Sequence, residues 1–509
     1  MKRPLLAGVF ALAFFAALLA STPTAQAGLF GLGAKKVATP SPSPSAEPTA
    51  TPEPPQIAIP RLQAKLKKNP DDQAAMASLA AEFLQINRPD YALPITQRLL
   101  KLGDKTAQVY YFDGIGQAAI GNFPAAAEDM QNASDLDPTN VGILGQLAEM
   151  YMRLNRPADA VRVAKRAVVF HKKDPRAYLG LGSVYAAEQQ YAKARAQYRL
   201  AAKVDPKGTQ SYLQIADTYA AQNNIDKALA SVDQVLQIAP TDIQALVFRA
   251  DLYAKEHDDA KVSIAYDDAV AAATSDGQRV AILVRKARYF AAEKKTQTAR
   301  GIFSQIVSQY PKVATGFVAF GDYYASQNNL MKAQQEWRAA LNVNKNSAPA
   351  LLRLGQYELQ SGHVPQAVGY LNRYVAVSPD PQGYALLGQA YTQAHNYKSA
   401  RTACGKSFSL QESPDTLGCI GGADFELRKY SEAAKVFDAL DRGARRFLES
   451  NPQLLFIAAK SYAKTNQPAK ALGTYQRVLR RMRKGTPAYK EVENYIANLR
   501  RAMAAKKKP

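Results

Sequence analysis

The sequence predicts an all-α fold built from stacked helix pairs, because small residues and prolines recur with a fixed period. A first register of small residues repeats every 34 residues, at Ala80, Gly114, Ala148, Gly182, Ala216 and Ala250. A second register has the same period, at Ala92, Ala126, Ala160, Ala194, Ala228 and Val262. After an irregular stretch it resumes at Ala299, Ala333, Ala367, Ala400, Ala433 and Ala471. Such a period is typical of helical repeats, whose single units cannot bury an apolar face alone and therefore stack.

Each unit reads as two helices followed, in most cases, by a proline. The closing prolines are Pro138, Pro206, Pro240, Pro311, Pro379, Pro414 and Pro452. The segment from Tyr178 to Pro206, YLGLGSVYAAEQQYAKARAQYRLAAKVDP, carries Gly180 and Gly182 inside its first predicted helix. A helical glycine costs roughly 1 kcal/mol relative to alanine. We therefore expect a second helix to cross closely at Gly182.

The repeat resembles the tetratricopeptide repeat, which has a small residue and an aromatic in its first helix and alanine, aromatic and alanine in its second. One unit shows the pattern in Leu181, Gly182, Tyr185, Ala194, Tyr198, Ala201 and Pro206, and another in Gly321, Tyr324, Ala333, Trp337 and Ala340. The resemblance implies a right-handed α-solenoid of about twelve helix pairs between residues 71 and 487. Gln117 and Asp424 stand where first-helix aromatics belong, which predicts looser packing in those units.

The first 27 residues have the layout of a secretory signal peptide. Lys2 and Arg3 form a basic head, an apolar stretch runs from Leu5 to Ala20, and Ala25-Gln26-Ala27 is a small-x-small cleavage site. We expect cleavage after Ala27, with an uncleaved N-terminal anchor as the alternative. Both predict an exported protein of the bacterial type, located in the periplasm or cell envelope or secreted from the cell.

The rest of the chain divides by composition into three parts. Residues 28–60 are rich in proline, serine and threonine, which predicts a disordered linker that is either a plain spacer or a tether or glycosylated stalk. The repeats are expected over residues 61–487, with a phase break near 270–280. A basic capping helix and tail are expected over residues 488–509.

The chain has two cysteines, Cys404 and Cys419. The first falls in the second helix of one unit and the other in the first helix of the next, and these helices are expected to be antiparallel neighbours. In an oxidising compartment paired thiols become disulfides. The two residues therefore form either a disulfide between units or two buried thiols.

The formal net charge of +22 is concentrated near the C-terminus, where residues 442–509 hold 17 lysines and arginines against three acidic residues. The candidate anion-binding residues are Arg477, Arg480, Arg481, Arg483, Lys484, Arg500 and Arg501. They either dock onto an anionic lipid surface, a polysaccharide or another acidic partner, or form a solvated capping helix with a basic tail. Nucleic acid is not expected, because the aromatic residues fall in core positions and no recognition motif is present.

The resemblance implies that the first helices line a concave groove in which protein or peptide partners bind. About one turn before the small-residue position stand the aliphatic residues Leu144, Leu179, Leu213, Val247, Val284, Val318 and Leu352. Directly after it stand Glu149, Ser183, Asp217, Asp251, Arg288 and Asp322. Either this face binds an extended segment with apolar and basic side chains, or the aliphatic residues only pack between neighbouring helices.

No catalytic, cofactor-binding or metal-binding motif stands out. The four histidines, His171, His257, His363 and His395, are scattered without metal-ligand spacing. We therefore predict a non-catalytic protein–protein interaction scaffold of the cell envelope that needs no cofactor. The alternatives are a protein that docks onto an anionic membrane or polymer through its basic region, and an accessory subunit of an envelope assembly or export complex. The oligomeric state stays open.

Overall fold

The computed structural model describes residues 53–505, and these residues form 27 helices and no strand. The chain divides into two compact units, residues 1–272 (unit 1) and 273–509 (unit 2), and the division falls where the repeat phase breaks in the sequence. The predicted signal peptide, most of the linker and the last four residues lie outside the described residues.

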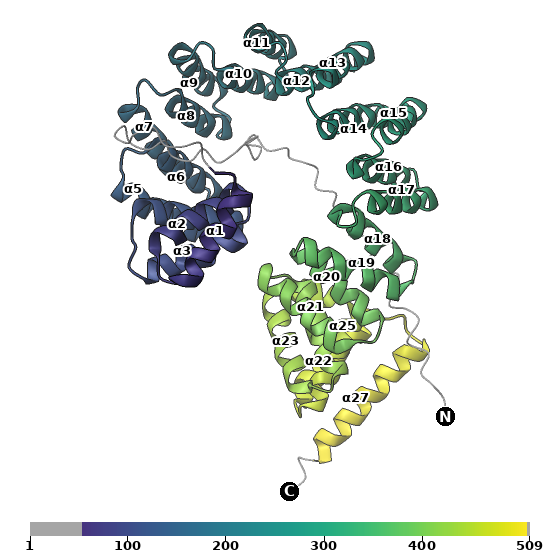
Figure 1. Cartoon of the computed structure of the whole chain (residues 1–509). Helices are drawn as coiled ribbons and strands as arrows, with labels where there is room; N and C mark the ends of the chain where they lie inside the picture. The colour runs from purple at the N-terminus through teal and green to yellow at the C-terminus, as the bar shows by residue number, and fades with distance from the viewer. Residues whose placement is uncertain (1–52, 506–509) are drawn as a thin grey trace. The chain divides into compact units, whose positions relative to one another are not determined.

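Unit 1 contains α1 (Pro55–Lys68) and six helix pairs. The pairs are α2 (Gln73–Gln85) with α3 (Pro89–Lys101), α4 (Ala107–Ala119) with α5 (Phe123–Leu136), α6 (Val141–Arg153) with α7 (Pro157–Phe170), α8 (Pro175–Ala187) with α9 (Tyr191–Val204), α10 (Thr209–Ala221) with α11 (Ile225–Ile238), and α12 (Ile243–Lys255) with α13 (Asp259–Ala272). Within this unit, α8, α10 and α12 lie on the inner side of the curve, and α9, α11 and α13 lie on the outer side (Figure 1).

Unit 2 contains six further pairs. They are α14 (Asp276–Ala292) with α15 (Thr296–Gln309), α16 (Ala314–Ser326) with α17 (Leu330–Val343), α18 (Ala348–Gln360) with α19 (Val364–Val377), α20 (Pro381–Gln393) with α21 (Tyr397–Leu410), α22 (Pro414–Glu426) with α23 (Tyr430–Gly443), and α25 (Pro452–Lys464) with α26 (Pro468–Leu479). The short α24 (Arg445–Ser450) interrupts the series, and α27 (Pro487–Ala505) follows it. The predicted all-α solenoid of about twelve helix pairs is confirmed.

The linker ends earlier than predicted. Helix α1 begins at Pro55, so residues 55–60, which we assigned to the linker, are helical. Proline is compatible with the first helical position, where its missing N–H has no partner in any case. Ala58 and Leu62 are buried against the first pair. The proline-rich composition therefore concealed a helix that is held in place by packing.

Each of the twelve pairs turns through one residue with positive φ. These residues are Asn87, Gly121, Asn155, Gln189, Asn223, His257, Lys294, Asn328, Gly362, His395, Arg428 and Asn466. In the first pair the Asn87 N–H donates to Leu84 O at 3.0 Å and the Arg88 N–H donates to Phe83 O at 2.7 Å. This is the Schellman pattern, which satisfies the last carbonyls of a helix, and it explains why every pair closes with the same geometry.

The glycine at position 182 is required by the close helix crossing that the sequence predicted. A Cβ built on Gly182 would lie 2.3 Å from the ring of Tyr198, which is fully buried in α9. The same relation, sixteen residues apart, joins Gly321 to Trp337 at 2.5 Å. Gly180 differs, because a Cβ there would meet nothing within 4 Å. Only one of the two glycines is therefore needed for packing.

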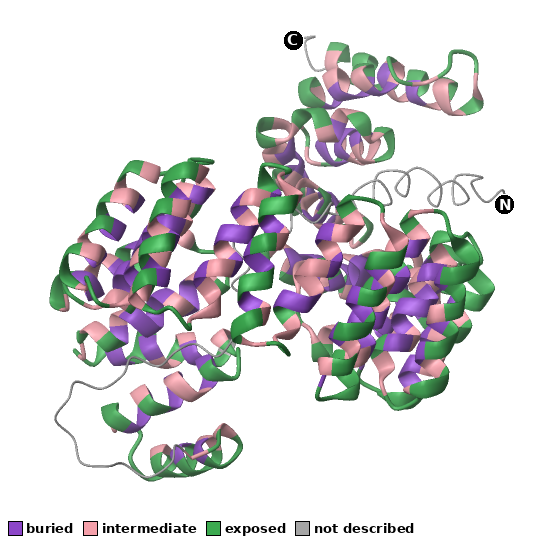
Figure 2. Cartoon of the chain, turned by 90° about the horizontal axis from the view of Figure 1, so that it is seen from above, coloured by how far each residue is buried: buried purple, intermediate pink, exposed green. Residues whose placement is uncertain are grey.

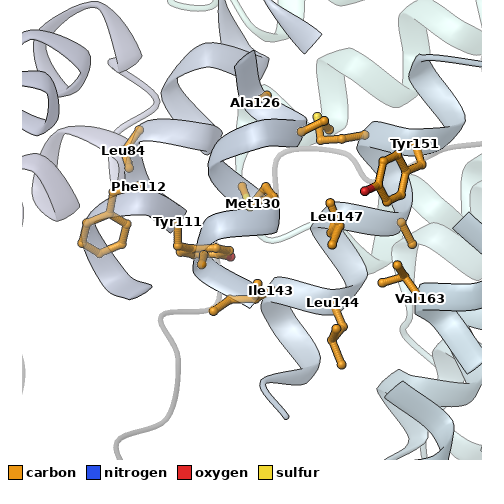
Figure 3. Close-up of a cluster of buried hydrophobic side chains, with 14 of the residues drawn as sticks. Leu84, Tyr111, Phe112, Ala126, Met130, Ile143, Leu144, Leu147, Tyr151 and Val163 are labelled. Atoms are coloured by element: carbon orange, nitrogen blue, oxygen red, sulfur yellow. The ribbon is translucent and has the colours of Figure 1, made fainter. Parts of the chain in front are cut away.

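The hydrophobic core runs between the helices of each unit. In Figure 2 the buried residues lie mainly where helices face one another, and the exposed residues lie on outward surfaces. Figure 3 shows part of this core, in which Met130 of α5 packs among residues of α4 and α6, including Tyr111 and Leu147. Since each layer joins residues of successive pairs, the core grows by repetition.

Two of the repeats that lack a first-helix aromatic hold the buried polar residues Gln117 and Asp424 in its place. Gln117 donates to Asp113 Oδ2 at 3.3 Å and accepts from Asn122 Nδ2 at 3.0 Å. Asp424 is fully buried and accepts a hydrogen bond from Arg401 Nε. Both side chains are held by hydrogen bonds. A polar contact therefore takes the place of the missing aromatic contact, for which we had predicted looser packing.

Cys404 and Cys419 form a disulfide between α21 and α22, with their Cα atoms 6.2 Å apart. The bond joins the second helix of one pair to the first helix of the next, as the spacing suggested. In the loop-entropy description, closing a 15-residue loop stabilises the folded state by about 3 kcal/mol. It therefore fastens two neighbouring pairs in unit 2.

We predict opposite effects for alanine at the two glycines of α8. Gly182→Ala forces a Cβ against the Tyr198 ring, and overpacking of a filled core costs about 1–3 kcal/mol. Gly180→Ala gains roughly 1 kcal/mol of helix propensity without a new contact. In urea denaturation followed by circular dichroism, the first variant should unfold at lower urea than the wild type and the second at higher urea. A rise in both midpoints would contradict the packing role of Gly182.

A carboxyl pair in the α4–α5 unit makes stability depend on pH. Burial raises the pKa of Asp129 to about 7, and the neighbouring Asp113 carboxylate contributes to this shift. A carboxyl whose folded pKa exceeds its unfolded pKa of about 3.9 contributes stability at low pH that is lost as pH rises through the folded value. We therefore expect this carboxyl to lower the melting temperature as pH rises from about 4 to about 7.

Asp129→Asn should flatten this profile, because the amide has no charge to bury near Asp113. At pH 8 the variant should melt above the wild type, and at about pH 4 the two should be close. Asp135→Asn is the matched control, since Asp135 is exposed on the same helix. If the melting temperature of Asp129→Asn falls with pH as steeply as that of the wild type, another group carries the pH dependence.

Candidate functional site

The first helices lie on one side of the pairs, and we call the surface that they form the first-helix face. Successive first helices contact one another at α2 and α4 and at α6 and α8 in unit 1, and at α14 and α16 and from α18 through α20 and α22 to α25 in unit 2. Within residues 53–505, no two successive second helices make comparably extensive contacts. At these places the first helices are therefore closer together than the second helices, as expected for the inner side of a curved repeat.

The aliphatic row on this face is partly core. Leu144, Leu213 and Val318 are buried at 0%, 4% and 8% exposure. The remaining four, Leu179, Val247, Val284 and Leu352, are half-buried. Packing between helices therefore accounts for the first three residues, and only the half-buried ones keep surface for a partner.

Leu144 is a correction to the predicted row. It lies four residues before Ala148, whereas Leu179 lies three residues before Gly182. In the structure Leu144 points into the core that also holds Leu147 and Val163 (Figure 3). Because one residue turns a helix by about 100°, the equivalent surface position in α6 is held by its neighbour, the exposed Gly145.

The polar row after the small-residue position supports the buried aromatics of the second helices. Tyr266 donates from its hydroxyl to Asp251 Oδ1 at 2.7 Å, and Trp337 donates from Nε1 to Asp322 Oδ1 at 3.1 Å. Ser183 lies 3.4 Å from the Tyr198 hydroxyl in the same arrangement. The partners are fifteen residues apart each time, a spacing that would have revealed this role in the sequence.

Other members of the row differ in their surroundings. Glu149 pairs with Arg153 of its own helix at 3.4 Å, and Arg288 is exposed. Burial raises the pKa of the Asp217 carboxyl, while the nearby Lys255 ammonium lowers it. Lys255 also donates to Ala220 O at 3.3 Å. The row is therefore mixed, with its acidic charge concentrated at Asp217 and Asp251 in unit 1.

Small residues follow one turn beyond the acidic positions, a feature that our sequence reasoning missed. They are Ala186 and Ala187 of α8, Ala220 and Ala221 of α10, and Ala254 of α12. Ala221 is exposed, and Ala187 and Ala254 are half-buried. Short side chains thus follow Asp217 and Asp251 along their helices, and the Lys255 ammonium lies near Asp217 and donates to Ala220 O.

The predicted basic region contains one residue that cannot serve as an exposed anion site. Arg477 keeps only 12% of its side chain exposed and pairs with Asp441 at 2.7 Å and Glu449 at 3.2 Å. We predicted that Arg477 binds external anions, but it forms ion pairs with acidic residues of α23 and α24, which precede α26 in the sequence. Arg481 also pairs with Glu449, at 3.4 Å, although half of its side chain is exposed.

The other basic candidates are exposed but do not form one cluster. Arg480, Arg483 and Lys484 lie in the connection from α26 to α27, whereas Arg500 and Arg501 lie near the end of α27. At 1.5 Å per residue, α27 separates the two groups by roughly 20 Å. The basic C-terminal region is therefore two patches at opposite ends of one helix.

In residues 53–505, no cluster of three or more histidine, cysteine or acidic residues could hold a metal ion. None of the helices in this range has both the length and the hydropathy to span a bilayer.

Comparison with known proteins identifies the same repeat that the sequence pattern resembles. Family models described as tetratricopeptide repeat match residues 118–184, 179–243, 281–312, 318–383, 352–406 and 453–481. A curated relative, the FAM10 family protein At4g22670 of Arabidopsis thaliana, is 31% identical over 85 residues. This match covers 17% of the present chain and only 19% of the relative.

Three solved structures are similar at low identity. Cut9–Hcn1, an APC/C hetero-tetramer, is 15% identical, with 87% of this chain and 93% of that chain covered and a TM-score of 0.33. YrrB, described as a TPR protein with an unusual peptide-binding site, is 23% identical, with coverages of 36% and 95% and a TM-score of 0.29. TTC0263, a thermophilic TPR protein of Thermus thermophilus, is also 23% identical, with coverages of 36% and 98% and a TM-score of 0.32.

The family assignment rests on the family models and on the twelve helix pairs. The matched ranges together span more than half of the chain, and all of them lie inside the predicted repeat region of residues 61–487. The small-residue positions, the second-helix aromatics and the shared turn recur in the structure with the period found in the sequence. The chain therefore belongs to the tetratricopeptide repeat family.

Proposed function

We propose that this protein is an exported, non-catalytic scaffold of the cell envelope that binds segments of partner proteins on the first-helix face of unit 1. Tetratricopeptide repeats support protein–protein interaction, and the observation that favours this face is its side-chain pattern. Half-buried Leu179 and Val247, the acidic Asp217 and Asp251 and the intervening alanines provide apolar contacts, negative charge and space together. An extended segment with apolar and basic side chains fits this pattern.

The shifted titratable groups support a structural rather than a catalytic role. Burial raises the pKa of Tyr198 to about 12, and it raises that of Tyr374 to the same value with help from a hydrogen bond to Asp380. These side chains lie inside helix pairs and hold them together. Asp129 belongs to the same class, since its partner Asp113 is buried within the pair.

Two features support export. The layout of residues 1–27 is that of a cleavable signal peptide. The disulfide between Cys404 and Cys419 is of a kind that persists in oxidising compartments and is rare in the cytosol of mesophiles. A location in the periplasm or on the envelope satisfies both features.

A charge change on the first-helix face should remove partners. Ala221→Lys with Gln244→Lys places two cations at exposed positions of α10 and α12, the first four residues after Asp217 and the second three residues before Val247. We expect the capture of envelope proteins by the purified chain, measured by quantitative mass spectrometry, to fall by about tenfold for the bound set. Repulsion of basic segments and loss of space are the physical causes.

The matched control adds the same charge to a second helix. Gln234→Lys with Gln237→Lys changes exposed residues of α11, on the opposite side of the pair. It should retain the wild-type partners. Both variants should keep the wild-type circular dichroism spectrum, and equal capture by both would refute a binding role for this face.

Export has its own test. We expect the chain isolated from the envelope fraction to begin at Gly28, because cleavage follows Ala27. Ala27→Arg should block processing and leave a longer chain in the membrane fraction, as read by mass spectrometry of the intact protein. A full-length wild-type chain found in the cytosol would refute export.

A further inference from the structure

The connection between α23 and α25 departs from the repeat. The small-residue positions Gly421 and Ala459 are 38 residues apart, whereas the usual spacing is 34. The extra residues form the short helix α24. Insertions in repeat proteins emerge as loops on one face, which is often a binding face.

The insertion meets the end of α26 and forms a strongly basic surface, which we call the arginine edge. It comprises residues 441–449 and 477–484, which hold eight basic residues and two acidic ones. The two segments are in contact, because Arg477 reaches Asp441 and Glu449 across them. Charge is therefore gathered here by the fold from two separate parts of the chain.

Both acids of the arginine edge are already occupied within the fold. Glu449 lies 3.2 Å from Arg445, 3.2 Å from Arg477 and 3.4 Å from Arg481. The hydrogen bond from Arg445, with the nearby Arg477 and Arg481 charges, lowers the pKa of Glu449. The edge thus holds one glutamate carboxylate between three guanidinium groups.

Five basic residues of the edge are exposed and have no carboxylate of the described residues within ion-pair distance, namely Arg442, Arg446, Arg480, Arg483 and Lys484. Arg442 donates from Nε to Asp438 O at 3.3 Å, and the other four remain available to an external ligand. Guanidinium groups bind carboxylates through paired N–H donors. The surroundings are polar, since none of the large hydrophobic residues of 411–505 is exposed.

We propose that the arginine edge binds an acidic segment of a protein partner, rich in glutamate or aspartate. The carboxylate of Glu449 shows the chemistry that the edge accepts, and the remaining cations extend the same surface outward. A bilayer is a poorer fit, because interfacial binding draws on apolar side chains that this surface lacks. The edge lies outside the first-helix face and outside unit 1, so it stands independently of the function proposed above.

The test uses the full chain and a fluorescent deca-glutamate peptide, with binding measured by anisotropy at low salt. Arg446→Ala, Arg480→Ala and Arg483→Ala together should weaken binding by at least about tenfold. The control triple variant, Lys312→Ala, Lys345→Ala and Lys398→Ala, removes the same charge from exposed positions elsewhere in unit 2 and should change binding by less than about twofold. An equal loss of peptide affinity in both triple variants would show that only net charge matters, and it would overturn the proposal.

A second pair of variants tests the role of the internal carboxylate. Glu449→Gln releases Arg445 and Arg481 and should tighten peptide binding several-fold, whereas Glu493→Gln makes the same charge change on the exposed side of α27 and should not. Ala221→Lys with Gln244→Lys should leave peptide binding intact, which separates this site from the first-helix face. Tighter binding to vesicles of roughly 30% anionic lipid than to the peptide would assign the edge to membranes and overturn the proposal.

Discussion

The contact between a small residue on the first helix of a pair and the residue sixteen positions later on the second helix, usually a bulkier one, underlies the whole structure. At Gly182, Gly321 and Gly355 the space that a Cβ would need is filled by Tyr198, Trp337 and Leu371. Protein interiors are packed as densely as organic crystals, so the two helices cannot separate without opening a void. This contact fixes the distance and angle within a pair, and repeating it fixes how one pair presents its surface to the next.

Polar groups complete what this packing leaves unsatisfied. A buried indole or phenol needs a hydrogen-bond partner, and Asp322 and Asp251 supply one to Trp337 and Tyr266. Where the first-helix aromatic is missing, Asp424 is buried instead and takes Arg401 as its partner. In one pair the packing position is Cys404, whose sulfur extends the contact into the next pair through the disulfide.

These demands decide which surface is left for binding. Fully buried residues of the first helices are committed to the core, whereas the half-buried aliphatics and several small residues of α8, α10 and α12 keep exposed surface. The same sorting applies to charge. Arg477 is used to hold α24 against α26, while Arg480 and Arg483 in the same segment face solvent. Binding surface and scaffold are thus drawn from neighbouring positions of one repeat.

The sequence alone determined the period, the helix pairs and the need for a small residue at Gly182, because these follow from local propensity and from spacing along one chain. It also placed Cys404 and Cys419 on adjacent helices. It did not reveal α1, since the packing of Leu62 outweighs a proline-rich composition that signals a linker. Only the tertiary structure decided that Leu144 is core, that a Cβ at Gly180 would meet no neighbour and that Arg477 is paired. Burial and ion pairing depend on residues brought together from distant parts of the chain, and their distances are set by packing in three dimensions.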